Sequence, residues 1–180
     1  AKARGVRVTA EASPHHLVLT EAAVEGYNTD AKMNPPLRTA DDMAAVRAGL
    51  ADGSLDVIAT DHAPHHYDEK EAAFEDAPNG LVGLETAVGI IMTNIVGEGV
   101  IDVVTMIDRM SCGPARAFGL SGGTLSEGAV ADVTVIDPRL RWTVDPSAFQ
   151  SRSQNTPFAG WELTGAPHRT IVGGRTVWAR

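Results

Sequence analysis

Residues 55–65 read Leu-Asp-Val-Ile-Ala-Thr-Asp-His-Ala-Pro-His, and this stretch decides the fold class. Its first six residues are mostly apolar, which is typical of a parallel strand buried on both faces. Polar loop residues begin at Asp61, so this aspartate is expected at the carboxyl end of the strand. Barrels of alternating strands and helices place their catalytic groups at that end. Asp61 is therefore the first candidate for a catalytic carboxylate.

The segments before this strand complete a strand–helix–strand unit. Residues 6–10, Val-Arg-Val-Thr-Ala, follow the Gly5 turn and predict another strand. Between the two strands, Thr39 can cap a helix through about Leu50, and Asp41 in its first turn suits the helix dipole. This order of elements indicates a parallel βαβ unit, so we expect an α/β fold.

The rest of the chain divides into a helical part and a strand-rich tail. A long polar loop is expected over residues 62–82, and loops of that length inside compact domains are usually functional. Further helices are predicted over residues 84–97 and 101–110, and from Pro114 to about Gly119. Strands are predicted in the tail over residues 132–137, 141–144, 161–164, 169–172 and 175–178, the last two joined by a tight turn at Gly173-Gly174.

Composition argues against several classes of protein. The net charge of −8, without a cluster of Lys and Arg, argues against a nucleic-acid partner. No apolar run reaches the length of a membrane span. Cys112 is the single cysteine, which excludes an internal disulfide and favours a reducing, cytoplasmic compartment. The chain opens on Ala1-Lys2 rather than Met, so we expect a missing N-terminal portion.

Asp61, His62 and His65 together favour a metal site. A carboxylate can bind zinc and still accept a proton from water. The alternative is an aspartate that only caps the following loop, and for Asp61 alone this would be the better explanation. His15 and His16 lie in a predicted loop, where adjacent side chains point to opposite faces, so the pair is unsuited to binding one ion.

Several segments, taken in order, resemble the cyclic amidohydrolases and, among them, the bacterial dihydroorotases. These segments are Ser13-Pro14-His15-His16-Leu17, Lys32-Met33-Asn34-Pro35-Pro36-Leu37-Arg38, Ala59-Thr60-Asp61-His62-Ala63-Pro64-His65, Asn155-Thr156-Pro157-Phe158 and the closing hairpin. The resemblance covers essentially the whole chain. The combination of the Asp61 and Asn34 motifs makes it specific.

The resemblance implies both a fold and a reaction. The fold is the C-terminal part of a (β/α)8 barrel in residues 1–120, followed by part of a small β-sandwich domain in residues 121–180. The reaction is the reversible hydrolysis of dihydroorotate to N-carbamoyl-L-aspartate in de novo pyrimidine biosynthesis, with one or two zinc ions. By this analogy Asp61 is a metal ligand and also the general acid and base, a role worth about 10²–10⁴-fold in rate.

The resemblance also assigns residues to a small-molecule substrate. Asn34 would bind the substrate ring through its amide, and local support of its own loop is the alternative. His65 would bind the substrate carboxylate, and an exposed loop histidine is the alternative. Asn79 and Gly80 would offer backbone groups, although Asn-Gly is also a common turn.

Structural roles are expected for the other conspicuous side chains. His62 is expected to support the site, and His66 is expected to be exposed. His15 and His16 are given a structural or supporting role. The three tryptophans are expected in the core of the β domain: Trp142, Trp161 and Trp178.

The other metal ligands of the family have no match in the chain. They are a His-x-His pair, a bridging carboxylate and two more histidines. A catalytic zinc needs about three protein ligands, so the chain alone is expected to be inactive. An allantoinase or dihydropyrimidinase-like hydrolase, and a non-catalytic dihydroorotase-like subunit, stay open as alternatives. The free edges of the β domain would also suit a homo-oligomer.

Overall fold

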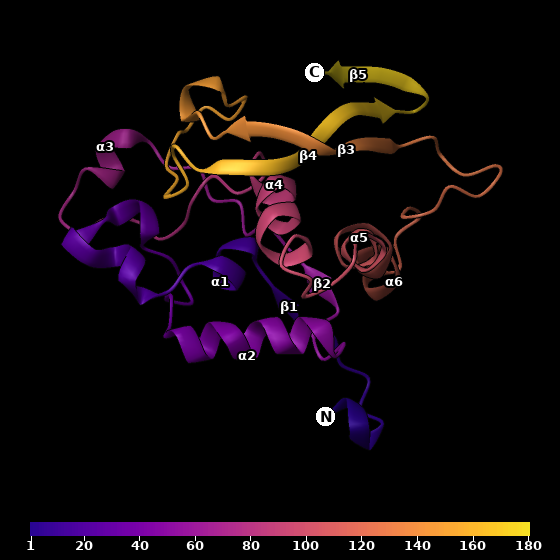
Figure 1. Ribbon diagram of the computed structural model, residues 1–180, viewed down its shortest axis with the longest axis horizontal. Helices are drawn as coiled ribbons and strands as arrows, with labels where there is room; N and C mark the ends of the chain where they lie inside the picture. Colours follow the sequence, from indigo (N-terminus) through magenta and orange to yellow (C-terminus); the bar gives the residue numbers. More distant parts are fainter.

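Two short parallel strands lie at the centre of the computed structural model, which describes residues 1–180 (Figure 1). Strand β1 (Glu11–Ala12) pairs with β2 (Val57–Ile58), and helix α2 (Ala40–Ala51) lies between them in the chain. The predicted parallel βαβ unit is confirmed. The carboxyl ends of both strands lead into the loops that carry the candidate site residues.

The first strand begins later than its sequence pattern predicts. Pairing covers only Glu11–Ala12, so the strand expected over residues 6–10 is wrong. The Ala10 carbonyl already accepts the amide of Asp56 at 2.8 Å, but the valines before it are exposed. A β pattern becomes a strand only beside a partner, and residues 6–10 have no partner strand in this chain.

The other helical segments are short. The α-helices are α1 (Pro14–Val18), α3 (Tyr67–Lys70), α4 (Ala87–Ile91), α5 (Val103–Ile107) and α6 (Gly113–Phe118), the 3-10 helices are η1 (Lys2–Arg4), η2 (Glu21–Tyr27), η3 (Thr29–Ala31) and η6 (Pro146–Ala148), and the π-helical turns are η4 (Met92–Val96) and η5 (Asp108–Cys112). The η4 turn continues α4, and η5 joins α5 to α6. The helices predicted in this region are therefore confirmed in their main parts. None of the helices has the length and apolar character that crossing a bilayer requires.

Local sequence explains where both α2 and α1 begin. Thr39 Oγ1 accepts the amide of Asp42 at 3.2 Å, and Asp42 Oδ2 accepts the amide of Thr39 at 3.2 Å, which forms a capping box. The loop predicted around His15 is wrong, because this residue lies in α1. Pro14 occupies the start of α1, where its missing N–H leaves no helical hydrogen bond unmade.

An antiparallel sheet packs against α4 (Figure 1). Its strands are β3 (Val133–Thr143), β4 (Glu162–Val172) and β5 (Arg175–Ala179), in the order β3-β4-β5. The turn predicted at Gly173-Gly174 is confirmed, with φ angles of +54° and +79°. The two strands predicted within residues 132–144 form one irregular strand, β3. This single sheet does not show the expected β sandwich, which stays a prediction.

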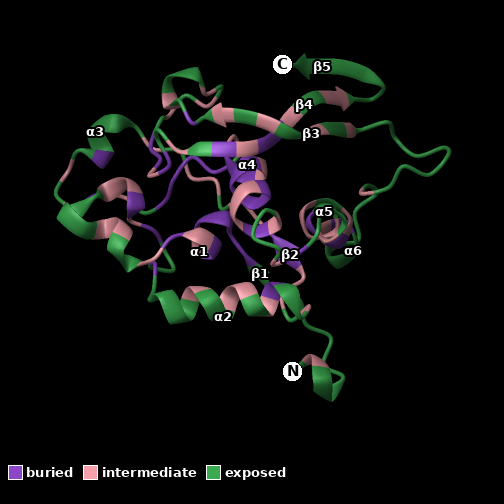
Figure 2. Ribbon diagram, in the orientation of Figure 1, coloured by how far each residue is buried: buried purple, intermediate pink, exposed green.

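Helix α4 lies between two hydrophobic clusters. Ile91 belongs to a cluster with Leu50 and Ile58, and Ile90 belongs to another with Phe158 and Leu163. Figure 2 shows α4 as largely buried, whereas β5 is exposed along its length. The helix therefore ties the parallel strand pair to the antiparallel sheet.

The tryptophans are not all in the core. Trp142 and Trp161 are partly buried and pack against the cluster of Ile90 without belonging to it, so their predicted core position holds only in part. Trp178 is 40% exposed, so its expected core position is wrong. It lies on β5, an edge strand whose residues are all exposed.

Candidate functional site

Asp61 lies just beyond the carboxyl end of β2, as the sequence predicts. Its backbone has a φ of +50°, in the left-handed region that costs a non-glycine residue about 1 kcal/mol or more. Its side chain is 54% exposed, and His15 Nε2 lies 3.8 Å from its Oδ2. A strained backbone thus holds an accessible carboxylate at the strand end.

A cleft of about 870 Å³ joins Asp61 to Asn34, because both residues line it. His16 connects two of its walls. Its Nδ1 lies 2.6 Å from Ser13 Oγ, and its Nε2 lies 2.8 Å from the Pro35 carbonyl. The His16 ring therefore anchors the loop that carries Asn34. The two motifs that make the family resemblance specific meet at one cleft.

His15 is a neighbour of Asp61 that sequence reasoning missed. Its side chain is 1% exposed, and its Nε2 lies 3.8 Å from Asp61 Oδ2 without a hydrogen-bond partner. Burial, with a smaller effect from His16, lowers the pKa of His15 to about 3, so the imidazole is neutral at pH 7. The Ser13-Pro14 pair, an N-cap residue followed by proline, could have indicated the helix that brings His15 to Asp61.

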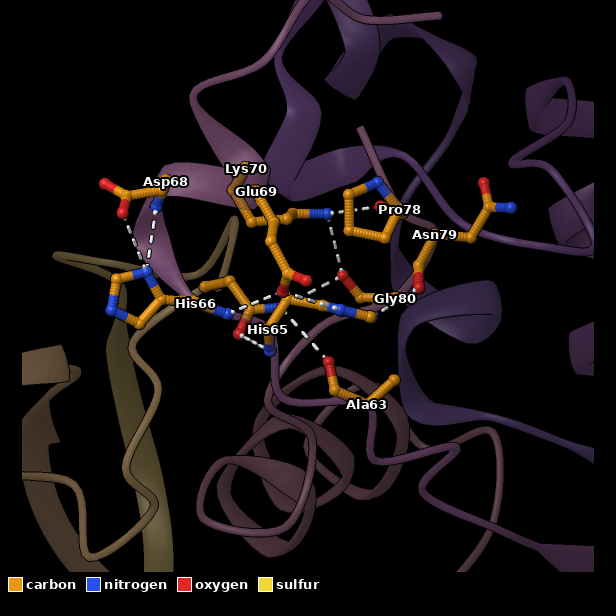
Figure 3. A network of polar contacts seen from close by, with 10 residues as sticks. Ala63, His65, His66, Asp68, Glu69, Lys70, Pro78, Asn79 and Gly80 are labelled. Carbon is orange, nitrogen blue, oxygen red and sulfur yellow. Dashed lines mark hydrogen bonds and ion pairs between the residues drawn. The ribbon is translucent and has the colours of Figure 1, made fainter. Parts of the chain in front are cut away.

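His65, Asn79 and Gly80 form a second group within the loop after β2 (Figure 3). Nε2 of His65 lies 3.0 Å from the Asn79 carbonyl, and a carbonyl only accepts, so Nε2 carries the hydrogen. Nδ1 of His65 lies 3.5 Å from the Glu69 carboxylate. Both ring nitrogens face acceptors, and a protonated His65 would serve both.

Gly80 has both of its backbone groups engaged. Its N–H donates to the Lys32 carbonyl at 2.8 Å, and its carbonyl accepts Lys70 Nζ at 3.0 Å and Asn155 Nδ2 at 3.1 Å. Its φ of +120° favours glycine. The amide of Asn79, in contrast, donates no hydrogen bond within the chain and is free for a ligand.

Lys32 connects the two groups. Its carbonyl accepts the Gly80 amide, and its Nζ donates to three carbonyls within residues 74–77 at 2.6 to 2.9 Å. Because Lys32 lies two residues before Asn34, the loop of Gly80 is held against the segment that carries Asn34. Hydrogen bonds of Lys32 therefore link the segment that lines the Asp61 cleft to the loop that carries Gly80.

His62 and His66 both accept hydrogen bonds from backbone amides of nearby segments. Nδ1 of His62 accepts the amides of Gly83 and Leu84 at 3.1 and 3.4 Å, the supporting role expected for it. His66 is exposed, as predicted, and its side chain caps α3. No group of three or more His, Cys, Asp or Glu side chains could hold a metal ion in this chain. Asp61 fits the role of one ligand, since its carboxylate is accessible.

The chain belongs to the amidohydrolase family, whose model matches residues 1–177. Its fold is similar to L-hydantoinase (dihydropyrimidinase) from Arthrobacter aurescens, with a TM-score of 0.92, 33% identity and coverage of 99% of this chain and 41% of that one. It is also similar to D-hydantoinase (dihydropyrimidinase) from Thermus sp., with a TM-score of 0.91, 30% identity and the same coverage. The α/β fold is thus the amidohydrolase fold.

Two curated relatives that match nearly the whole chain are both dihydroorotases. A dihydroorotase of Geobacter metallireducens is 56% identical over 180 residues, which are 100% of this chain and 42% of that protein. A dihydroorotase of Syntrophotalea carbinolica is 58% identical over 178 residues, 99% of this chain and 42% of that protein. The chain therefore spans 42% of the length of these relatives, and the predicted resemblance to dihydroorotases is confirmed.

Proposed function

We propose that the chain is part of a dihydroorotase, which interconverts dihydroorotate and N-carbamoyl-L-aspartate in de novo pyrimidine biosynthesis. The observation that carries this proposal is the placement of Asp61. An accessible carboxylate on strained backbone follows a parallel strand and lines a cleft with Asn34. Relatives that are 56% and 58% identical are named dihydroorotases, which supports dihydroorotate as the substrate.

The proposed architecture is a (β/α)8 barrel followed by a small β domain. The parallel pair β1–β2, linked by α2, supports the assignment of residues 1–120 to the barrel. The antiparallel sheet β3-β4-β5 supports the assignment of residues 121–180 to the β domain. The other barrel strands and the second layer of the sandwich would belong to parts of the longer protein outside this chain.

One or two zinc ions complete the proposed site, with Asp61 as one ligand. A catalytic zinc takes about three protein ligands, so the others would come from outside this chain. When bound, zinc lowers the pKa of water to about 7. Asp61 takes a proton from the attacking water and delivers it to the leaving amide nitrogen.

The substrate would lie between the cleft and the loop of His65. Asn34 offers an amide whose donors and acceptor complement the amide edge of the ring. A protonated His65 has two donors, so one can bind the substrate carboxylate in place of Glu69. The free amide of Asn79 would donate to the substrate, and Gly80 would hold that amide in place.

Turnover by the full-length protein tests the proposal. We expect dihydroorotate to be a better substrate than allantoin or dihydrouracil. Asp61→Asn should lower kcat by at least about 100-fold, because the amide cannot move the proton. Tm should stay within about 2 °C, since asparagine keeps the shape and tolerates the left-handed backbone. Asp68→Asn, an exposed carboxylate of the same loop, is the matched control. Near-normal turnover by Asp61→Asn would refute the acid–base role.

A dihydropyrimidinase-like hydrolase is the second candidate, because the L-hydantoinase (dihydropyrimidinase) structure matches with a TM-score of 0.92. Dihydrouracil lacks the carboxylate that dihydroorotate carries, so this candidate leaves His65 without its proposed ligand. Preference of the full-length protein for dihydrouracil or allantoin would select a sister enzyme. Absence of turnover with every cyclic amide would select a non-catalytic dihydroorotase-like subunit.

A further inference from the structure

Asn155 is a buried polar residue far from Asp61 in sequence, and its side chain is fully hydrogen-bonded. It is 6% exposed and lies between η6 and β4. Its Oδ1 accepts the amide of His65 at 3.0 Å, and its Nδ2 donates to the carbonyls of Ala63 and Gly80, each at 3.1 Å. One oxygen and both amide hydrogens therefore each have a partner.

These partners belong to the two segments that the proposed function assigns to substrate binding. Ala63 and His65 lie in the loop after β2, and Gly80 follows Asn79 in the next turn (Figure 3). The Asn155 carbonyl also accepts the amide of Val82 at 2.8 Å. Asn155 therefore links the His65 segment to Gly80, beside the direct hydrogen bond from the Ala63 amide to the Leu81 carbonyl at 2.8 Å.

Lys70 holds the same turn from another direction. Its Nζ donates to the carbonyls of Pro78 and Gly80 at 2.9 and 3.0 Å (Figure 3). The carbonyls on either side of Asn79 are therefore both held by Lys70. The side chain of Lys70 does not bond to residues 63–65, whereas Asn155 joins both Ala63 and the His65 amide to the Gly80 carbonyl.

We propose that Asn155 is a positioning residue for recognition of the substrate carboxylate, acting through His65. It holds the His65 backbone at the distance where the ring reaches the Asn79 carbonyl, beside the Asn79 amide that has no partner within the chain. Aspartate has no donor for the Ala63 and Gly80 carbonyls, and alanine has no polar group. This inference rests on the proposed dihydroorotase function and adds to it a residue outside the barrel segment.

Kinetics of the full-length protein test the proposal through the variants Asn155→Asp and Asn155→Ala. We expect KM for dihydroorotate to rise at least tenfold and kcat to fall less than threefold, because Asp61 keeps its place after β2. Gln154→Ala changes the exposed neighbouring side chain and should leave both constants unchanged. Asn155→Asp is nearly isosteric and decides the matter if Asn155→Ala does not fold.

Combination with His65→Ala distinguishes positioning from a general loss of stability. If Asn155 acts through His65, Asn155→Asp should raise KM less than twofold in the His65→Ala background. The proposal is overturned if the KM of the double variant rises by the product of the two single tenfold effects. It is also overturned if Asn155→Asp lowers Tm but leaves KM unchanged, or if neither Asn155 variant folds. An unchanged KM in His65→Ala alone would instead contradict the carboxylate role in the proposed function.

Discussion

Gly80→Ala would bring a methyl group against Ala63 at the turn of the proposed substrate loop. The added Cβ would lie 2.4 Å from the Cβ of Ala63 and 3.5 Å from its carbonyl oxygen. The φ of +120° at this position is also one that L residues rarely adopt. The substitution therefore carries a steric cost and a separate backbone cost.

The backbone cost applies at both Gly80 and Gly160, but the steric cost applies only at Gly80. A residue held in a disfavoured backbone conformation costs about 1–3 kcal/mol, and overpacking adds about 1–3 kcal/mol. We expect Gly80→Ala to lower the free energy of unfolding by about 2–6 kcal/mol. Gly160 is the matched control, because its φ is +78° and no atom lies within 4 Å of an added Cβ. Gly160→Ala should cost about 1–2 kcal/mol, from the backbone alone.

Urea unfolding of the full-length protein measures both costs, and Ala63→Gly separates them. In the double variant the clash is gone, so the coupling between Ala63→Gly and Gly80→Ala should recover about 1–3 kcal/mol. KM for dihydroorotate should rise in Gly80→Ala and recover partly in the double variant, because Asn79 moves with its neighbour. If Gly80→Ala costs no more than Gly160→Ala, or if Ala63→Gly recovers nothing, the reasoning is refuted.

Two further predictions concern stability. Thr39→Ala removes the cap of α2 and should lower the unfolding free energy by about 1 kcal/mol, measured by urea unfolding. Thr20→Ala is its control, since Thr20 precedes η2 without a side-chain cap, and an equal loss in both would contradict the capping argument. The hydrogen bond from Lys2, with that from the Ala10 amide, lowers the pKa of Asp56 below its usual value near 4. The ionised Asp56 therefore stabilises the fold above about pH 4 and loses this effect as pH falls through its folded pKa. Asp56→Asn should lower Tm more at pH 7 than at pH 2, and equal losses at both values would contradict this assignment.

The sequence was sufficient where structure depends on neighbouring residues. Thr39 and the nearby Asp42 form the capping box that begins α2, and Gly173-Gly174 supply the positive φ angles of the closing turn. The position of Asp61 at the strand end was predicted because the apolar strand residues stop there and polar loop residues begin. Strand pairing could not be predicted from the local sequence. Residues 6–10 have a strand pattern, but they have no partner strand in this chain.

The sequence by itself determined the βαβ order, the start of α2, the closing hairpin and the candidate carboxylate at Asp61. Only the tertiary structure decided which groups surround that carboxylate and hold the neighbouring loops. His15 reaches Asp61 because α1 follows β1 directly and packs against α2 and α4, and Asn155 reaches Gly80 from 75 residues away. Sequence spacing specifies which residues are polar and where helices begin. It does not specify which buried donor meets which carbonyl, because that depends on how α4 joins the parallel strands to the antiparallel sheet.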